Sequence, residues 1–442
     1  MDQLPGDVLA DVLGRLPPRN LAAYRSICKA WHAVIDGHRL LRKDLLPLTV
    51  AGIYAVYDNV SAKHSPPTFF SRPSAGARIQ GNLRYLDKIR PGIGWSRIGV
   101  HCNGLILLSE GVVNPATRQW AFLPPYPDRT RVKGFGQFAF LAFDPTVSPH
   151  FEVFFMHCVI HRYGGENTDL YPGSPGSEWP PSPFVMSAFS SKTWRWEERS
   201  FAREGAAVRS VADVEPFLQS VYGHESVYWQ GRLYVDQIYF VIRLSLEDNK
   251  YRVIHLPPIN TAYPQIDPYL GKSEKGVYYG FEHHGCDLQI WFLNESTHDP
   301  EWTLKHEIDL RPTLASFSWK HGDGSWSVQQ DVNHKALEKE ELEWDSDNED
   351  GTVATAAATE VNVLKGFDDY IFILGFHPYK EIVFLYTWSK RVMAYHLNSS
   401  KLEELGCLPS GEDDEMRSSC IYTPCWMESC LRTNGLETNI NH

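Results

Sequence analysis

The feature that most constrains the fold is a change in the spacing of apolar residues after residue 47. Before it they recur at helical intervals. Beyond it they form short alternating or continuous runs of about four to nine residues, which is typical of β-strands. Such runs lie at 52–57, 105–108, 138–143, 151–158, 227–235, 238–244, 290–293, 370–376 and 382–388. Because aromatic residues favour strands, the 13% aromatic content agrees with an all-β region after a small helical unit.

A weak repeat organises the β region. A strand, a polar turn and a second strand that often closes with Leu-Pro recur, with turns near residues 114, 190, 247, 294 and 398. If the last interval holds two units and the first carries the Pro/Gly-rich stretch 164–183, the period is about 50 residues, which is typical of a kelch-like blade. The sequence therefore predicts an α+β multidomain chain that ends in a propeller of about six blades, and a stacked pair of β-sandwiches is the alternative.

Closure of this propeller requires pairing between its two ends. A strand at 52–57 is expected to complete a sheet with a strand near 420–426, so that no long sheet edge is left open. The dipeptide Asn103-Gly104 also predicts a type I′ hairpin turn, because both central positions of that turn need a positive φ.

The first 47 residues predict helices with more apolar surface than they can hide. Pro5 and Asp7 suit the first turn of a helix, and Pro17 and Pro18 end it. On that helix the apolar residues span about 180°, whereas one core-facing contact needs about 100°. They are Leu4, Val8, Leu9, Val12, Leu13 and Leu16.

Two further helical elements follow, a short one around 20–22 and one that ends at Gly37. The apolar face of the last is formed by Tyr24, Ile27, Cys28, Trp31, Val34 and Ile35. Three helices in fewer than about 45 residues can scarcely bury enough surface to stand alone. We therefore expect another polypeptide to cover this unit, and a generic three-helix cap on the next domain is the alternative.

These helices resemble an F-box. The resemblance rests on the stretch 4–17, on Leu21, on the run 25–31 and on Val34-Ile35, and it covers nearly the whole motif. It implies binding to the SKP-type adaptor of a cullin-RING ubiquitin ligase, while the rest of the chain captures a target protein. The residues implied at the adaptor interface, or packed immediately behind it, are Leu4, Pro5, Val8, Leu9, Val12, Leu13, Leu16, Pro17, Leu21, Ile27, Cys28 and Trp31.

A second stretch resembles the opening of the F-box-associated domain of plant F-box proteins. It comprises residues 102–108 followed by 113–118. The two resemblances divide the chain into an F-box at 1–47, a propeller at 48–430 and a tail at 431–442. They imply the substrate-recognition subunit of an SCF ubiquitin ligase, which is not itself catalytic. The alternatives are an adaptor-bound protein that acts outside degradation, and a propeller enzyme or binding module with a helical appendage.

Charge narrows the class of partners. The net charge of −12 disfavours a nucleic-acid binder. Residues 338–350 carry eight acids against one base, so we expect an acidic mobile insertion at 335–360.

Neither a basic secretory leader nor an apolar run of about 18 residues is present, which predicts a cytoplasmic or nuclear protein without a membrane span and with reduced thiols.

No motif predicts a cofactor, a metal or a catalytic centre. The stretch 282–287 gathers Glu, His, Cys and Asp, but Gly285 favours a hairpin tip there. His157 and His161, if both lie on one strand, would stand about 13 Å apart, too far to share an ion. The glycines of 92–99 lack dinucleotide-loop spacing. Which residues of the β region bind a target is not specified by any of these patterns.

Overall fold

The computed structural model describes most of the β region and two helices near the N-terminus. The described residues are 6–14, 28–38, 40, 50–58, 67–72, 79, 81, 83, 85–86, 100–127, 135–159, 178–207, 209–210, 225–237, 240–258, 268–283, 285–296, 299–316, 325–329, 354–355, 370–409, 415–427 and 431. The expected short helix around 20–22 lies outside these ranges, as does nearly all of the expected acidic insertion.

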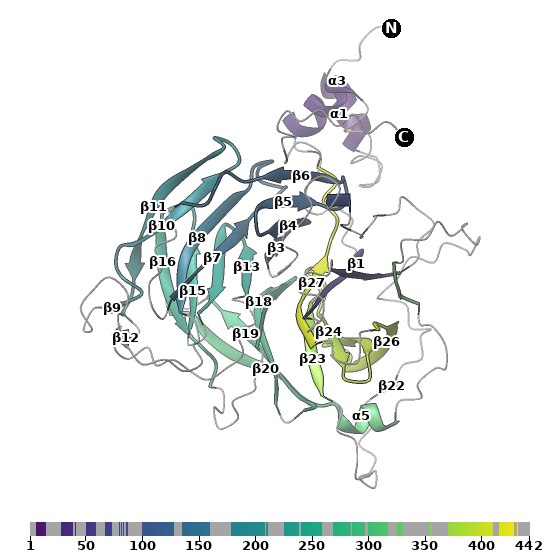
Figure 1. The fold of residues 1–442 in the computed structure, drawn as a ribbon. Coiled ribbons are helices and arrows are strands. Elements are labelled where there is room, and N and C mark those ends of the chain that lie inside the picture. Colours follow the sequence, from purple (N-terminus) through teal and green to yellow (C-terminus); the bar gives the residue numbers. More distant parts are fainter. Residues whose placement is uncertain are drawn as a thin grey trace.

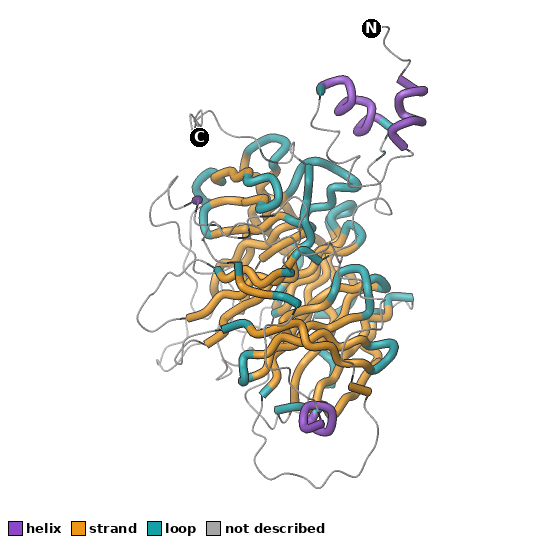
Figure 2. Tube along the Cα trace, turned by 90° about the vertical axis from the view of Figure 1, so that its right-hand side faces the viewer, coloured by secondary structure: helices purple, strands orange, loops and turns teal. Residues whose placement is uncertain are grey.

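Two helices lie together at one end of the molecule, beyond β6 (Gln119–Phe122) (Figure 1). They are α1 (Gly6–Gly14) and α3 (Lys29–Gly37), which contact each other. The predicted stop at Gly37 is confirmed. Past it, the amide of Leu40 donates to the carbonyl of Ile35 at 2.9 Å. Figure 2 shows both helices set apart from the body of strands, and the third described helix, α5 (Arg311–Ser316), lies at the opposite end.

The remaining described elements are strands, so the chain after the helices is predominantly β, as predicted. Three four-stranded sheets have the orders β21-β2-β1-β27, β3-β4-β5-β6 and β17-β18-β19-β20. Their bounds are β21 (Ser327–Val328), β2 (Thr68–Ser71), β1 (Gly52–Asp58), β27 (Glu415–Tyr422), β3 (Val100–Cys102), β4 (Leu105–Leu108), β5 (Gly111–Asn114), β17 (Tyr269–Ser273), β18 (Gly276–His283), β19 (Asp287–Asn294) and β20 (Glu301–Asp309).

Three further sheets have the orders β22-β26-β25-β24-β23, β13-β14-β15-β16-β11-β10-β8-β7 and β12-β9. Their bounds are β22 (Ala354–Thr355), β26 (Lys401–Cys407), β25 (Arg391–His396), β24 (Ile382–Thr387), β23 (Ile371–Phe376), β13 (Ser226–Trp229), β14 (Arg232–Asp236), β15 (Phe240–Ser245), β16 (Lys250–His255), β11 (Arg195–Glu204), β10 (Phe184–Ser190), β8 (Glu152–Val159), β7 (Phe135–Ala142), β12 (Arg209–Ser210) and β9 (Glu178–Trp179).

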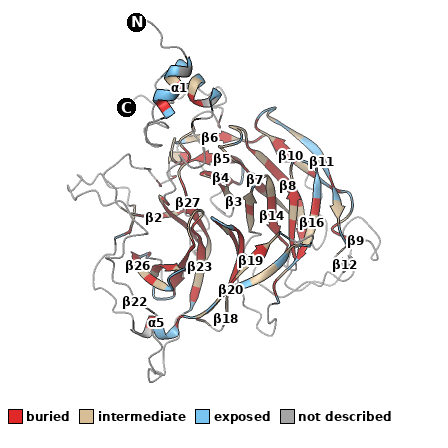
Figure 3. Cartoon of the chain, turned by 180° about the vertical axis from the view of Figure 1, so that it is seen from behind, coloured by how far each residue is buried: buried red, intermediate tan, exposed pale blue. Residues whose placement is uncertain are grey.

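The sheets surround a common centre. Strand β13 contacts β17, β17 contacts β23, β23 contacts β27, and β3 contacts β7, so the strands at one edge of each larger sheet meet around that centre. Figure 3 shows buried residues along the middle strands of the sheets, such as β4 and β18, whereas β11 and β20 contain few or none. The core is therefore divided into several clusters between neighbouring sheets.

The predicted repeat corresponds to five hairpins in four of the sheets, two of them in the eight-stranded sheet. The turns near 114, 190, 247, 294 and 398 join β5 to β6, β10 to β11, β15 to β16, β19 to β20 and β25 to β26. In four of them the residue just before the second strand has a positive φ of 54° to 60°. These residues are Arg118, Trp194, Asn249 and Ser400. The interval from 294 to 398 is expected to hold two such units, and residues 330–353 and 356–369 within it lie outside the described part of the chain.

The expected closure is confirmed. Strand β1 pairs antiparallel with β27, with Gly52 opposite Tyr422 and Val56 opposite Ser418. The pairing partner ends at Tyr422 and does not reach residue 426. Two sequence-distant ends of the β region are thus joined in one sheet. Leu431, the first residue of the expected tail, is buried in a core cluster with Leu105.

The Asn103-Gly104 turn is also confirmed, since φ is 46° and 90° at these two residues between β3 and β4. A Cβ on Gly104 would lie 2.5 Å from the Cβ of Cys425. Position 104 therefore requires glycine for two reasons, its positive φ and its close contact with Cys425. Among the described residues, no helix is long and apolar enough to cross a membrane.

Candidate functional site

The two N-terminal helices share a small core. Leu13 of α1 and Ile35 of α3 are 1% and 0% exposed. Partly buried side chains around them are Leu9, Trp31, Val34 and Leu40. Leu13 and Leu9 are neighbours on one side of α1, because four residues make about one helical turn. This side of the helix is covered by the chain itself.

The other half of the predicted apolar arc is uncovered. Val8 and Val12, one turn apart on α1, are 46% and 50% exposed. They lie about 100° around the helix from Leu9 and Leu13, so contact with α3 cannot reach both pairs. Exposed apolar residues arranged together on one helix face are typical of a protein-interaction site.

Of the other predicted interface residues, four are described by the structure and six are not. Cys28, just before α3, is exposed. Leu13 packs behind the exposed face, and Leu9 and Trp31 are partly buried beside it. The remaining predicted residues lie outside the described part of the chain, namely Leu4, Pro5, Leu16, Pro17, Leu21 and Ile27.

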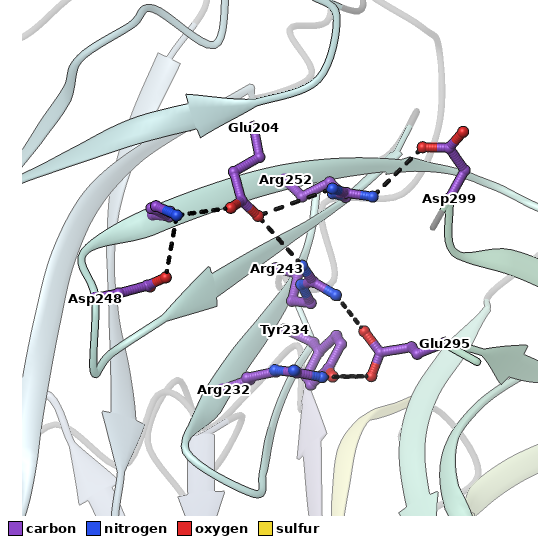
Figure 4. A network of polar contacts seen from close by, with 9 residues as sticks. Glu204, Arg232, Tyr234, Arg243, Asp248, Arg252, Glu295 and Asp299 are labelled. Atoms are coloured by element: carbon purple, nitrogen blue, oxygen red, sulfur yellow. Dashed lines mark hydrogen bonds and ion pairs between the residues drawn. The ribbon is translucent and has the colours of Figure 1, made fainter. Parts of the chain in front are cut away.

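A charged network joins three parts of the β region (Figure 4). Glu295, from the turn after β19, accepts a hydrogen bond from Arg243 of β15 at 2.6 Å and bonds from Arg232 and Tyr234 of β14 at 3.0 and 2.8 Å. The side chains of Arg243 and Glu295 are 12% and 20% exposed. Burial, and then the nearby Glu295 carboxylate, raise the pKa of Tyr234 above its ordinary value.

The network continues to the end of β11. Glu204 lies 3.1 Å from the ammonium of Lys250, 3.7 Å from Arg243 and 3.9 Å from Arg252. Arg252 reaches Asp299 at 3.4 Å. Each basic group here faces a carboxylate, so the arrangement links sheets and presents no surplus charge to a ligand.

A pocket at the centre of the sheets was not predicted from the sequence. Its lining comes from β3, β13, β17, β23 and β27 and from residues next to them, and it includes His101, Glu225 directly before β13, Tyr228, Tyr269, Lys272 and Phe376. Its cavity volume is about 50 Å³. The residues come from five strands that are far apart in the sequence, so no local motif could identify them.

The environment of this pocket alters several ionisable groups. Burial, and then the nearby Asp236, raise the pKa of Glu225 to about 8. Burial, and then Lys272, lower the pKa of His101 to about 4. Burial also raises the pKa of the Cys102 thiol to about 11. At neutral pH the pocket therefore holds an uncharged histidine, an unreactive thiol and a carboxyl group that is mostly protonated.

The stretch 282–287 is a hairpin tip, as predicted. His283 pairs with Asp287 across β18 and β19, and Gly285 has a φ of 85° in the turn. The Glu282 carboxylate accepts a hydrogen bond from the amide of Gly285. Within the described part of the chain, no three His, Cys, Asp or Glu side chains converge in an arrangement suited to a metal ion.

Comparison with known proteins agrees with the geometry of the helices. Residues 1–46 match the F-box-like family model. The F-box protein At5g07610 of Arabidopsis thaliana is 24% identical over 341 residues, which are 70% of this chain and 71% of its own. The F-box/LRR-repeat/kelch-repeat protein At2g27520 of the same plant is 28% identical over 142 residues, 28% of this chain and 33% of its own.

Among solved structures, the extracellular domain of a hybrid two-component system from B. thetaiotaomicron covers 83% of this chain and 34% of its own, with 9% identity and a TM-score of 0.30. A likeness this low carries no argument about the fold. The sequence matches and the helix pair agree, and they show that this chain carries an F-box-like domain at its N-terminus and has plant F-box proteins, some of them F-box/kelch-repeat proteins, as its relatives.

Proposed function

We propose that this protein is the substrate-recognition subunit of an SCF-type ubiquitin ligase. The observation that carries the proposal is the exposed apolar face of Val8 and Val12, on a helix within the F-box-like match. An SKP-type adaptor would cover this face, and the adaptor would connect the chain to a cullin-RING core. Burying both valines would contribute a few kcal/mol at most, so the residues around them must add to the interface.

We propose further that the β region is a propeller of six blades, each of four strands, with the short β22 as a fifth strand in one of them. The sheet orders support it, because β27, β3, β7, β13, β17 and β23 would each be the innermost strand of one blade. The eight-stranded sheet then comprises two blades, joined where β11 runs parallel to β16 at residues 202–204 and 250–252. A closed ring of this kind would give a rigid platform for a target protein.

The proposed mechanism is proximity and involves no chemistry by this chain. The propeller would hold a target while the F-box anchors it to the ligase core, so that a target lysine lies close to the ubiquitin carried by a separate conjugating enzyme. The gain is in effective concentration, as in any tethered reaction. Placement in the cytoplasm or the nucleus, where such ligases act, is part of this proposal.

Affinity capture from plant cells with the proteasome blocked tests this function. We expect the wild-type chain to retain an SKP-type adaptor, a cullin and ubiquitinated proteins that accumulate under the block. A chain with Val8→Asp and Val12→Asp should retain none of the ligase core. Capture of the adaptor without any cullin would instead favour a protein that acts outside degradation.

A further inference from the structure

We propose that the central pocket binds an ammonium or guanidinium group through the carboxylate of Glu225. The pocket is lined by the inner strands of five sheets, so it lies where an inserted side chain would contact several of them at once. If the group belongs to a target protein, this inference deepens the proposed function and rests on it. Binding of the cation itself does not depend on the ligase.

Glu225 has no counter-charge among the described residues, and the one charged neighbour that shifts its pKa is the acidic Asp236. The glutamate carboxyl group makes no hydrogen bond or ion pair with another described residue, whereas Glu204, Glu295 and Glu404 are each paired with arginine. The position of Glu225 is nevertheless fixed, because its backbone carbonyl accepts the amide of Asp236 at 3.0 Å. Asp236 is 7% exposed and adds negative charge behind it. A carboxyl group that lines a pocket and has no basic partner among the described residues favours a cationic ligand.

The two bases that line the pocket, His101 and Lys272, do not supply this counter-charge. The Lys272 ammonium donates to the Asn103 side-chain oxygen at 2.8 Å and to the Tyr228 carbonyl at 3.2 Å, both neutral acceptors. Tyr228 lies three residues after Glu225, about 10 Å along an extended chain. His101 is uncharged at neutral pH because its pKa is about 4. Neither base therefore neutralises Glu225.

The walls of the pocket also suit a cation. Tyr228, Tyr269 and Phe376 line the pocket, and aromatic faces attract cations. Two glycines make room for these rings. A Cβ on Gly271 would lie 2.4 Å from the Phe376 ring, and one on Gly375 would lie 2.8 Å from the Tyr269 hydroxyl oxygen. The wall is thus built by close packing that a larger residue would disrupt.

Protonation of Glu225 gives the proposal a pH signature. Since its pKa is about 8 in the free protein, most of the carboxyl groups carry a proton at pH 7. A bound cation favours the ionised form, so affinity should rise about tenfold between pH 7 and pH 9. The neighbouring groups do not titrate in this window, because His101 has a pKa of about 4, Cys102 of about 11 and Tyr228 of about 12. The pKa values of Tyr269, Tyr279 and Cys420 are raised well above their ordinary values, mainly by burial.

Calorimetric titration of the purified full-length chain tests the proposal. The probes are n-butylammonium and n-butylguanidinium, with neutral butyramide as the control, and the peptides acetyl-Gly-Lys-Gly-amide and acetyl-Gly-Gln-Gly-amide. We expect the cations to bind and their neutral analogues to bind at least tenfold more weakly. The lysine peptide binding as well as the free amine would indicate a basic residue of a target as the natural source. Binding of the free amine alone would indicate a small molecule and would overturn the extension to a target.

Two variants identify the site. Glu225→Gln should abolish both the preference for cations and the rise of affinity with pH. Glu247→Gln, at an exposed turn, should change neither. A cooperative melting transition of Glu225→Gln at pH 6, at or above the wild-type temperature, would show that the variant is folded. Equal binding of butyramide and butylammonium by the wild type, or unchanged cation binding by Glu225→Gln, would overturn the proposal. Adaptor capture, measured separately, reports on the proposed function alone.

Discussion

Tyr54 lies directly opposite Cys420 in the ladder between β1 and β27, and this pairing joins the first strand of the β region to its last. Both side chains are fully buried, and the Tyr54 ring contacts the Tyr422 ring edge-on with centroids 5.5 Å apart. The sheet in which β1 pairs with β27 therefore also contributes aromatic residues to the core. The stability of the whole β region should depend on it.

Truncation after Pro409 tests this dependence. It removes β27 and leaves β1 with an open edge, so we expect the cooperative thermal transition, followed by far-UV circular dichroism, to be lost or to shift downward by at least about 10 °C. A chain truncated after Leu431 keeps the ladder and is the control. Equal melting of the Pro409 truncation and the full chain would show that the ladder does not close the structure.

Gly104 and Gly205 allow strain and crowding to be separated. Both have a φ of 90°, but only a Cβ at Gly104 would collide with Cys425, whereas nothing lies within 4 Å of one at Gly205. Gly205→Ala should cost about 1 kcal/mol of unfolding free energy from φ alone. Gly104→Ala should cost about 1–3 kcal/mol more from overpacking. Urea denaturation measures both, and equal losses would contradict the crowding at Cys425.

The charged network predicts unequal roles for two acids. Glu295→Gln leaves Arg243 without its closest carboxylate in a mostly buried position, so we expect a loss of about 1–3 kcal/mol in unfolding free energy. Asp299, whose side chain is 92% exposed, pairs with Arg252 at the periphery. Asp299→Asn should change the same quantity by less than about 0.5 kcal/mol. If both variants unfold alike in urea, the network does not hold the sheets together.

Glu225 also makes stability depend on pH. Its folded pKa of about 8 lies above its ordinary value, so the folded state binds the proton more tightly than the unfolded state does. This contribution is fully present below about pH 4.5 and is lost as the pH rises through 8. Glu225→Gln should remove it, so the variant should gain stability relative to wild type between pH 6 and pH 8 and then keep a constant difference. If the melting temperatures of the two proteins change by the same amount between pH 6 and pH 9, the burial of this carboxyl group is contradicted.

Local patterns predicted the parts of the fold that local physics determines. Asn103 and Gly104 specify their turn because few residues tolerate a positive φ. The polar turns near 114 and 398 mark hairpins because Asn and Ser side chains bond to the backbone of a turn, as the Asn114 side-chain oxygen does with the amide of Ala116. The pairing of 52–57 with the last strand followed from the need to protect sheet edges. The spacing between 294 and 398 does not by itself determine the number of units, because an insertion and a second unit lengthen the interval equally.

Other features depend on contacts that a sequence pattern does not contain. The arc on the first helix indicated that a partner was needed, but it could not show that α3 covers the side of Leu13 and leaves Val8 and Val12 open. The central pocket was missed for a related reason. Glu225 and Lys272 acquire their setting only when five strands from distant parts of the chain meet.

The most direct test of the account is binding of the purified full-length chain to a purified SKP-type adaptor, measured by calorimetry. Val8→Asp with Val12→Asp places two charges on the exposed face of α1 and leaves the core around Leu13 intact, so we predict at least a hundredfold loss of affinity. Val147→Asp with Val185→Asp makes the same change at exposed valines of the β region and should bind like wild type. Wild-type affinity in the α1 variant would contradict the assignment of this face to the adaptor.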